Sequence, residues 1–160
     1  MSAMMQTVIE LRRVVQALAH GLPHPLWGVV LFGSTAREEA TETSDLDLLV
    51  VADSFPEAFT ERLRLLRSLV PAPLRGRVSL VGKTRAEFET SFPSYYLDLG
   101  LDGIVLYDRE RYMEGKIECI RSLIERAGLT RQRIDHGFVW RWREPPAGHW
   151  RIDWSGVHGQ

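Results

Sequence analysis

The sequence predicts an α/β (α+β) domain, in which a small mixed β-sheet is flanked by helices and followed by a Trp-rich C-terminal β-hairpin. Short apolar runs rich in β-branched residues alternate along the chain with amphipathic helical stretches. The chain has 160 residues, 44% hydrophobic and 26% charged, which is the size and composition of one globular domain. Because strands that alternate with helices form layers, we expect a mostly buried sheet.

The N-terminal half is predicted to contain two long helices and two strands. Residues 26–32 (LWGVVLF) and 45–51 (DLDLLVV) are apolar runs typical of buried strands. Gly33-Ser34 separates them and begins a short helical stretch that reaches Glu39. The helices before and after this pair have apolar residues spaced by three and four, namely Met4, Val8, Leu11, Val15 and Leu18, and then Phe59, Leu63, Leu66 and Val70.

The C-terminal half continues the alternation. Residues 75–82 (RGRVSLVG) and 103–108 (GIVLYD) are the third and fourth strand candidates. Between them, Thr84 with Glu87 three residues later predicts a helix start with a capping box. A last amphipathic helix ends at Gly128, and its apolar stripe is Met113, Ile117, Ile120, Ile124 and Ala127.

The tail after this helix alternates aromatic and basic residues on both sides of a Pro-Pro-Ala-Gly turn. Trp140 and Trp142 share one face of the first arm, while Trp150, Ile152 and Trp154 share one face of the second. The pattern predicts a β-hairpin with an aromatic face and a charged face. We expect the aromatic face to pack on the domain; a subunit interface, as in a homodimer, and a base-stacking surface are the alternatives.

Composition narrows the class of function. A net charge of −1 gives no sign of a polyanion binder, so nucleic acid is not an expected partner. The single Cys119 excludes an internal disulfide, and no run approaches the roughly 18–20 apolar residues that cross a bilayer. We therefore expect a cytoplasmic protein without a membrane partner. The five histidines show no metal-ligand spacing, which argues against a zinc site.

The stretch FGSTAREEATETSDLDLLVV, residues 32–51, carries the chemistry. Asp45 and Asp47 are two residues apart on a predicted strand, so both carboxylates point to one side and the intervening leucine to the other. Two such charges repel unless a cation lies between them, and this oxygen donor set suits Mg²⁺. Gly33 allows a tight turn, and Ser34 offers a hydroxyl and a helix start for phosphate. The combination predicts a site for a nucleoside triphosphate with Mg²⁺.

This arrangement resembles a known family. Gly-Ser, ten intervening residues and Asp-x-Asp are similar to the signature of the minimal nucleotidyltransferases of the DNA polymerase β superfamily. Ala36, Ser44 and the run LLVV after the motif agree with it. The resemblance extends over about residues 5–127, so we assign residues 1–130 to a nucleotidyltransferase domain and residues 131–160 to the tail, packed on the domain or at an interface.

The resemblance implies roles for five residues. Gly33 and Ser34 would lie at the triphosphate, and Arg37 would steady a phosphate. Asp45 and Asp47 would be the catalytic aspartates that hold one or two Mg²⁺ ions. Glu38, in contrast, stands where relatives often have glycine.

One catalytic group of the family is missing. Active members carry a third carboxylate on the next strand, where this chain has Ser79 or Arg77. Its loss removes the general base for the acceptor hydroxyl, which typically costs about 10²–10⁴-fold in rate, but two aspartates can still hold one Mg²⁺ with phosphate. A partner could supply the missing group, or one of four carboxylates of this chain could substitute for it: Glu87, Glu89, Asp98 and Asp102.

Two hypotheses follow. The first is an enzyme that uses Mg²⁺ to transfer a nucleoside monophosphate, AMP from ATP, to a hydroxyl of a protein or small molecule. The resemblance favours a protein acceptor, because many small members are antitoxins that modify a HEPN-type toxin with AMP. The alternative is a catalytically impaired protein that binds a nucleotide or a partner, with the Trp-rich tail in the interface.

Overall fold

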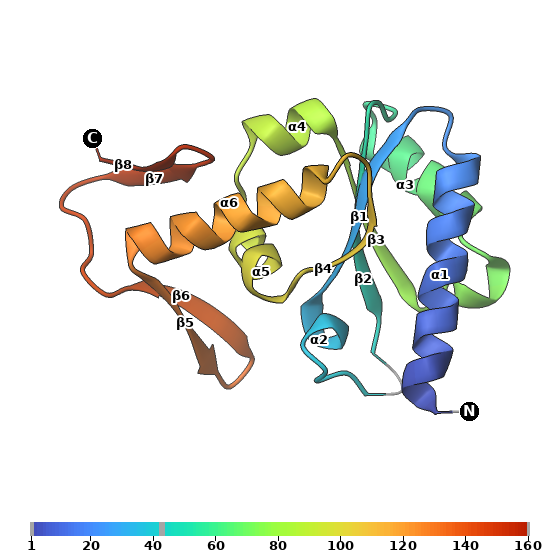
Figure 1. Ribbon diagram of the computed structural model, residues 1–160, viewed down its shortest axis with the longest axis horizontal. Helices are drawn as coiled ribbons and strands as arrows, with labels where there is room; N and C mark the ends of the chain where they lie inside the picture. The colour runs from blue at the N-terminus through green and yellow to red at the C-terminus, as the bar shows by residue number, and fades with distance from the viewer. Residues whose placement is uncertain (1, 42–43, 160) are drawn as a thin grey trace.

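The computed structural model describes residues 2–41 and 44–159 (Figure 1). Its central sheet has four strands in the order β3-β2-β1-β4. β1 is antiparallel to both of its neighbours, whereas β2 and β3 are parallel. The strands are β1 (Leu26–Phe32), β2 (Leu46–Ala52), β3 (Val78–Thr84) and β4 (Ile104–Asp108). The predicted mixed sheet is therefore confirmed.

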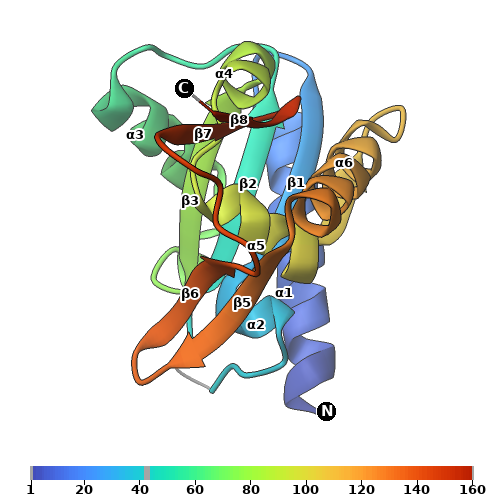
Figure 2. The same cartoon turned by 90° about the vertical axis from the view of Figure 1, so that its left-hand side faces the viewer.

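Helices cover both faces of the sheet. The helices are α1 (Ala3–Gly21), α2 (Gly33–Ala36), α3 (Phe59–Leu69), the 3-10 turn η1 (Ala72–Leu74), α4 (Arg85–Thr90), α5 (Tyr95–Asp102) and α6 (Tyr112–Ala127). α1 and α3 lie on one face, and α4, α5 and α6 on the other (Figures 1 and 2). None of the helices in the described ranges is both long and apolar enough to cross a bilayer.

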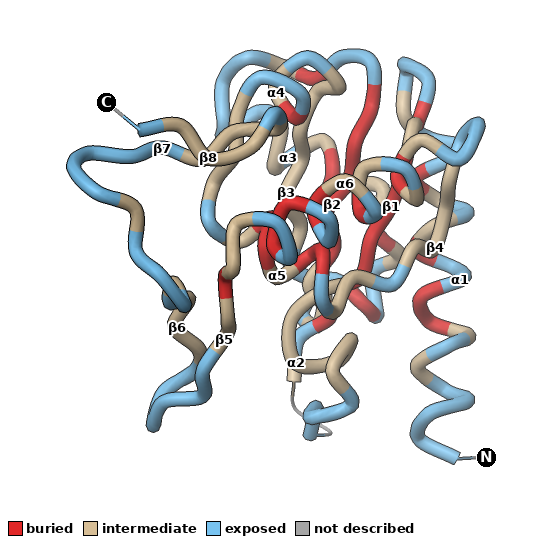
Figure 3. The backbone as a smooth tube through the Cα atoms, turned by 60° about the vertical axis from the view of Figure 1, so that its left-hand side comes forward, coloured by how far each residue is buried: buried red, intermediate tan, exposed pale blue. Residues whose placement is uncertain are grey.

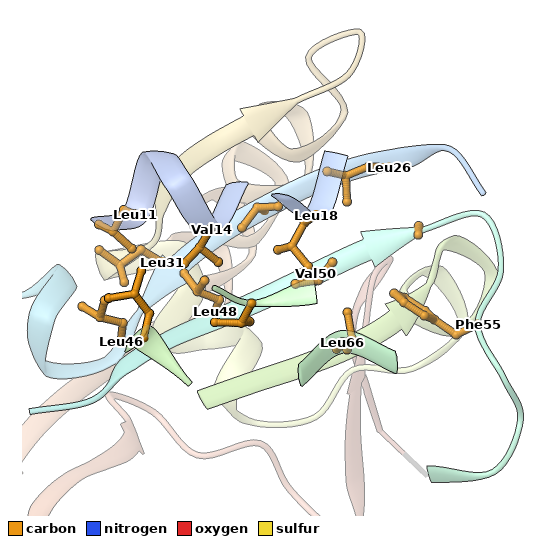
Figure 4. Packing of buried hydrophobic residues seen from close by; sticks show 14 residues of the cluster. Leu11, Val14, Leu18, Leu26, Leu31, Leu46, Leu48, Val50, Phe55 and Leu66 are labelled. Carbon is orange, nitrogen blue, oxygen red and sulfur yellow. The ribbon is translucent and has the colours of Figure 1, made fainter. Parts of the chain in front are cut away.

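β2 runs through the middle of two cores. Leu46, Leu48 and Val50 join the cluster under α1 and α3 (Figure 4), while Leu49 and Val51 join the cluster under α5 and α6. All five side chains are fully buried. Because successive strand residues point to opposite faces, a strand covered on both sides has to be apolar almost throughout. This explains why the run LDLLVVA has a single charged residue.

Local signals set several helix ends where the sequence predicts them. The capping box is present, because Thr84 Oγ1 accepts from the Glu87 amide and Glu87 accepts from the Thr84 amide. Gly128 ends α6 in the left-handed conformation. The stripe predicted for α1 is buried only in its second half, since Met4 and Val8 are 70% and 50% exposed. The sheet does not extend far enough to cover the first turns of this helix.

The tail contains hairpin structure as predicted, but its strands pair differently. It forms two hairpins, β5 (Leu129–Ile134) with β6 (Gly137–Trp142), and β7 (Trp150–Asp153) with β8 (Gly156–Gly159). The segment with the Pro-Pro-Ala-Gly turn connects them and forms no ladder between Trp142 and Trp150. The two-residue turn at 135–136 closes at a lower entropic cost than this longer connection. The prolines of the longer connection also lack an N–H to donate to a strand ladder.

The aromatic side chains of the tail pack largely on the domain. Three of them, Trp140, Trp142 and Trp154, contact the core under α5 and α6, and so does Ile152. Trp154 is also fixed by hydrogen bonds, since its Nε1 donates to the carbonyls of Phe88 and Ser91 at 2.8 and 3.0 Å. Apart from Leu129, the described residues of both hairpins are only partly buried or exposed (Figure 3). The hairpins therefore cover the domain without a core of their own.

Candidate active site

The Asp-x-Asp motif lies at the start of β2, beside the end of β1. In the ladder, Asp47 is opposite Phe32 of β1 and Ser79 of β3. It shares its face of β2 with Leu49, which packs in the core under α5 and α6. Asp45 directly precedes the strand, and its carbonyl accepts a hydrogen bond from Thr35 Oγ1 at 3.1 Å. The two carboxylates stand at the open end of a buried sheet.

Gly33 brings the first half of the motif against the second. Its φ of +75° is one that side chains other than glycine's rarely adopt. A Cβ built on Gly33 would lie 2.3 Å from Asp47 Oδ2, closer than any real contact. The backbone then turns tightly around Ser34, because the amides of Arg37 and Glu39 donate to the carbonyls of Gly33 and Ser34 at 3.3 and 3.0 Å. The Gly-Ser turn and Asp47 are therefore in direct contact.

The electrostatics of the pair favour a cation. Burial, and then the nearby charge of Asp45, raise the pKa of the Asp47 carboxyl above its ordinary value. The positive charge of Arg37 acts in the opposite direction and lowers this pKa. Oxygen donors that repel one another are the donor set that Mg²⁺ neutralises. The residues present thus fit a divalent cation.

Arg37 is held from several sides. Its Nε donates to Glu39 Oε2 at 3.1 Å, its Nη1 lies 3.5 Å from Asp102 Oδ2, and its guanidinium lies 4.9 Å from the centre of the Phe138 ring. Glu38 turns the chain between Arg37 and Glu39 with a φ of +59°. A left-handed backbone favours glycine, which agrees with the glycine that the family resemblance implies at this position.

Comparison with known proteins identifies the family. The sequence pattern of the nucleotidyltransferase domain family matches residues 11–96, more than half of the chain, and this range contains Gly33, Ser34, Asp45 and Asp47. The chain belongs to the nucleotidyltransferase domain family. The family predicted from the Gly-Ser and Asp-x-Asp motifs is confirmed.

Individual relatives agree with this assignment. "Putative protein adenylyltransferase MJ1305" of Methanocaldococcus jannaschii is 31% identical over 107 residues, which cover 63% of this chain and 71% of that protein. A chain of a toxin–antitoxin crystal structure with AMP-PNP has a TM-score of 0.55 at 20% identity, covering 72% of this chain and 87% of that one. A chain of the complex of tri-AMPylated Shewanella oneidensis HEPN toxin with MNT antitoxin has a TM-score of 0.52 at 18% identity, covering 74% and 87%. At such identities the two structures show a shared fold.

The two residues that the sequence offers for the position of the expected third carboxylate, Ser79 and Arg77, differ in where they lie. Ser79 of β3 is opposite Asp47 in the parallel ladder and is exposed. Arg77 lies just before β3 and pairs with Glu10 at 2.6 Å, on the side of α1. Among the described residues, no three His, Cys, Asp or Glu side chains come together as a metal site. Within the described ranges, Asp45 and Asp47 thus have no third carboxylate, histidine or cysteine grouped with them.

The four carboxylates considered as substitutes are engaged in ion pairs. Glu87 pairs with Arg62 at 2.7 Å, and Glu89 with Arg85 at 3.1 Å. Asp98 and Asp102 both bind Arg131, at 3.0 and 2.5 Å. Each of the four is thus held by a guanidinium, and none replaces the missing base in this conformation.

Sequence reasoning missed the residues that hold Arg37. Asp102 and Phe138 lie 65 and 101 positions after Arg37 in the printed sequence, and neither belongs to a motif. The one available signal was the alternation of basic and aromatic residues in the tail, which indicated a charged face but not what it contacts. The described hollows of about 460, 290 and 230 Å³ lie around α3 and α1, and neither Asp45 nor Asp47 lines them.

Proposed function

We propose that this nucleotidyltransferase transfers AMP from ATP to a hydroxyl group of a protein, with Mg²⁺ as cofactor. The observation that carries the proposal is the contact between the Gly33 turn and Asp47, with Asp45 beside it. A half-buried carboxylate whose pKa is raised by burial and by a neighbouring carboxylate is a liability unless a cation binds there. A nucleoside triphosphate with its Mg²⁺ supplies that cation.

Each residue of the motif has a role in this proposal. Asp45 and Asp47 hold Mg²⁺, as one or two ions. Gly33 lets the backbone approach the triphosphate, the Ser34 hydroxyl donates to a phosphate oxygen, and Arg37 balances phosphate charge. When bound, Mg²⁺ neutralises charge on the phosphate oxygens and orients the chain of phosphates for in-line attack.

The reaction balances as a simple transfer. The oxygen of the acceptor hydroxyl forms a bond to the α-phosphorus of ATP, and the bond from that phosphorus to the bridging oxygen of the β-phosphate breaks. Pyrophosphate leaves with the electron pair of the broken bond, and the hydroxyl proton passes to solvent. Ser79 cannot take this proton as a carboxylate would, so we expect turnover slower by about 10²–10⁴-fold than with a general base.

The acceptor class follows from the relatives. The sequence relative is named as a protein adenylyltransferase, and the fold is shared with chains from toxin–antitoxin complexes, one of them with an AMPylated HEPN toxin. We propose by analogy that the acceptor is a protein and that a HEPN-type toxin is the partner, as in an antitoxin that modifies its toxin.

The serine opposite Asp47 favours a second candidate function. A chain with both aspartates but no third carboxylate can bind a nucleotide with one Mg²⁺ and regulate its partner by contact alone. This candidate shares the binding step with the first and differs in the transfer step. A binding experiment followed by a transfer experiment therefore separates the two.

The first experiment is calorimetric titration of the purified protein with ATP, with and without Mg²⁺. We expect Mg²⁺-dependent binding that the Asp45→Asn/Asp47→Asn double variant loses by at least about 10²-fold, because hydrogen bonds and ion contacts to charged groups are the strong ones. Glu125→Gln, an exposed carboxylate on α6, is the matched control and should bind as the unaltered protein does.

Transfer of labelled AMP to a co-purified HEPN-type protein then decides between enzyme and binding module. Label on the partner that depends on both aspartates supports the enzyme. Binding without label supports the second candidate. Absence of binding with ATP, GTP, CTP and UTP alike would rule out both.

A further inference from the structure

A cluster of arginines gathers around Phe138 of β6. The guanidinium groups of Arg37, Arg131 and Arg133 lie 4.9, 4.3 and 4.8 Å from the centre of its ring. Arg131 and Arg133 belong to β5, whereas Arg37 follows the Gly-Ser turn of the candidate active site. The β5–β6 hairpin thus reaches back to α2 and the residues that follow it (Figure 2).

The three arginines differ in how many carboxylates they bind. Arg131 is bidentate on Asp102, at 2.5 and 2.9 Å, and also donates to Asp98 at 3.0 Å. Arg37 and Arg133 instead meet on one carboxylate, that of Glu39, which accepts from Arg37 Nε at 3.1 Å and from Arg133 Nη2. Asp102 lies farther from Arg37, at 3.5 Å, and is already engaged by Arg131.

Two guanidiniums that converge on one small anion form the recognition geometry of a phosphate. Arginine forks donate in pairs to carboxylate and phosphate oxygens alike, but a terminal phosphate or pyrophosphate carries more charge than a carboxylate. The hydrogen bonds from both arginines lower the pKa of Glu39, so this group is ionised and mimics an anionic ligand. The Arg37 amide donates to the carbonyl of Gly33 at 3.3 Å, and Gly33 is the residue that contacts Asp47, so Arg37 lies next to the proposed Mg²⁺ site.

We propose that Arg37 and Arg133 form the binding site for the pyrophosphate part of the nucleotide, and that Glu39 occupies this site until the nucleotide displaces it. The identity of the anion rests on the proposed function; the exchange of Glu39 for an anion rests on the contacts. Asp102 and Phe138 are positioning residues, because they hold Arg37 while Glu39 moves away. The β5–β6 hairpin is then a wall of the nucleotide site.

The exchange gives Glu39 a role both when the nucleotide binds and when pyrophosphate leaves. An incoming triphosphate must break the bridge from Glu39 to Arg37 and Arg133, which lowers affinity but favours the more highly charged ligand. After transfer, the same carboxylate competes with the leaving pyrophosphate for the two arginines and thereby promotes product release. Removal of its charge should tighten the binding of pyrophosphate.

The test is calorimetric titration with inorganic pyrophosphate in the absence of Mg²⁺, so that the aspartates contribute no metal-bridged contact. We expect Glu39→Gln to tighten pyrophosphate binding by about 3–10-fold and Arg133→Gln to weaken it by about 10-fold. In the double variant the gain from Glu39→Gln should shrink, because the competitor has lost one of its two partners. Arg151→Gln is the control: it removes an arginine of equal exposure, 66% against 65%, from the other hairpin.

The outcomes separate this inference from the proposed function. Any of three results overturns the inference, provided that the melting temperatures are unchanged. Glu39→Gln binds pyrophosphate no more tightly than the unaltered protein, or it binds no pyrophosphate at all. The third is that Arg133→Gln has the same affinity for pyrophosphate as Arg151→Gln. Any such result leaves the function intact as long as Mg²⁺-ATP still binds through Asp45 and Asp47. Conversely, a pyrophosphate response to Glu39 and Arg133 without any Mg²⁺-ATP binding supports the anion site and overturns the nucleotide chemistry.

Discussion

Substitution of Gly33 by alanine tests the contact on which the proposed function depends. Gly33 has a φ of +75°, and a Cβ built there would lie 2.3 Å from Asp47 Oδ2 and 3.2 Å from its Cγ. Nothing but Asp47 is among its three nearest neighbours. The change therefore perturbs the site through one carboxylate and leaves both cores untouched.

The expected cost has a backbone part and a steric part. A left-handed backbone at a residue other than glycine costs about 1–2 kcal/mol, which lowers the Tm of a chain of this size by about 2–8 °C. The steric part falls on Asp47, because real Cβ contacts essentially never lie below 3.0 Å and the present gap of 2.3 Å must open by about 0.7 Å. Displacement of a positioning group by up to 1 Å costs about 10²-fold in rate.

Two measurements follow the change: the melting temperature, and the affinity for Mg²⁺-ATP with the rate of AMP transfer. Gly115→Ala is the matched control, since a Cβ on Gly115 meets no heavy atom within 4 Å in α6. It should raise stability by up to about 1 kcal/mol and leave ATP binding unchanged. Combination of Gly33→Ala with Asp47→Ala removes the clashing oxygen, so only the backbone cost should remain.

Either of two results would show that a side chain at position 33 does not displace Asp47. One is Gly33→Ala binding Mg²⁺-ATP as tightly as Gly115→Ala, because Asp47 would then not be displaced. The other is that Gly33→Ala lowers the Tm by the same amount whether residue 47 is aspartate or alanine. The steric part of the cost would then be absent.

The remaining predictions concern the same end of the sheet. Ser79→Asp places a carboxylate opposite Asp47 on an exposed strand position and should raise the rate of AMP transfer by about 10²-fold or more, with Ser79→Asn as the uncharged control; no increase over Ser79→Asn would contradict it. Because the folded pKa of Asp47 is raised above its ordinary 3.8, the metal-free protein loses stability as pH rises from below that value through the raised pKa. Asp47→Asn should therefore melt higher than the unaltered protein at pH 7 without Mg²⁺ and lose this advantage at pH 3, which thermal unfolding at the two pH values measures.

Much of the fold could be predicted because its signals are local. The periodicity of apolar residues located the four strands and the long helices, and the Thr84–Glu87 capping box and the Gly128 stop set helix ends within a few residues. In the tail, local alternation correctly indicated hairpin strands but gave the wrong partners for them. Strand pairing depends on loop closure and on which strand is nearest, and β6 found β5 across a two-residue turn.

The candidate site also has some features that the sequence predicts and others that only the structure shows. The sequence by itself determined the family and the two halves of the motif, because Gly-Ser and Asp-x-Asp carry their chemistry in residue type and spacing. Only the tertiary structure decided that Ser79 stands opposite Asp47 and that Arg133, 94 residues from Glu39, shares its carboxylate with Arg37. Contacts of that kind join segments whose separation along the chain leaves no periodic trace, since they arise when packed helices and strands bring the charges together.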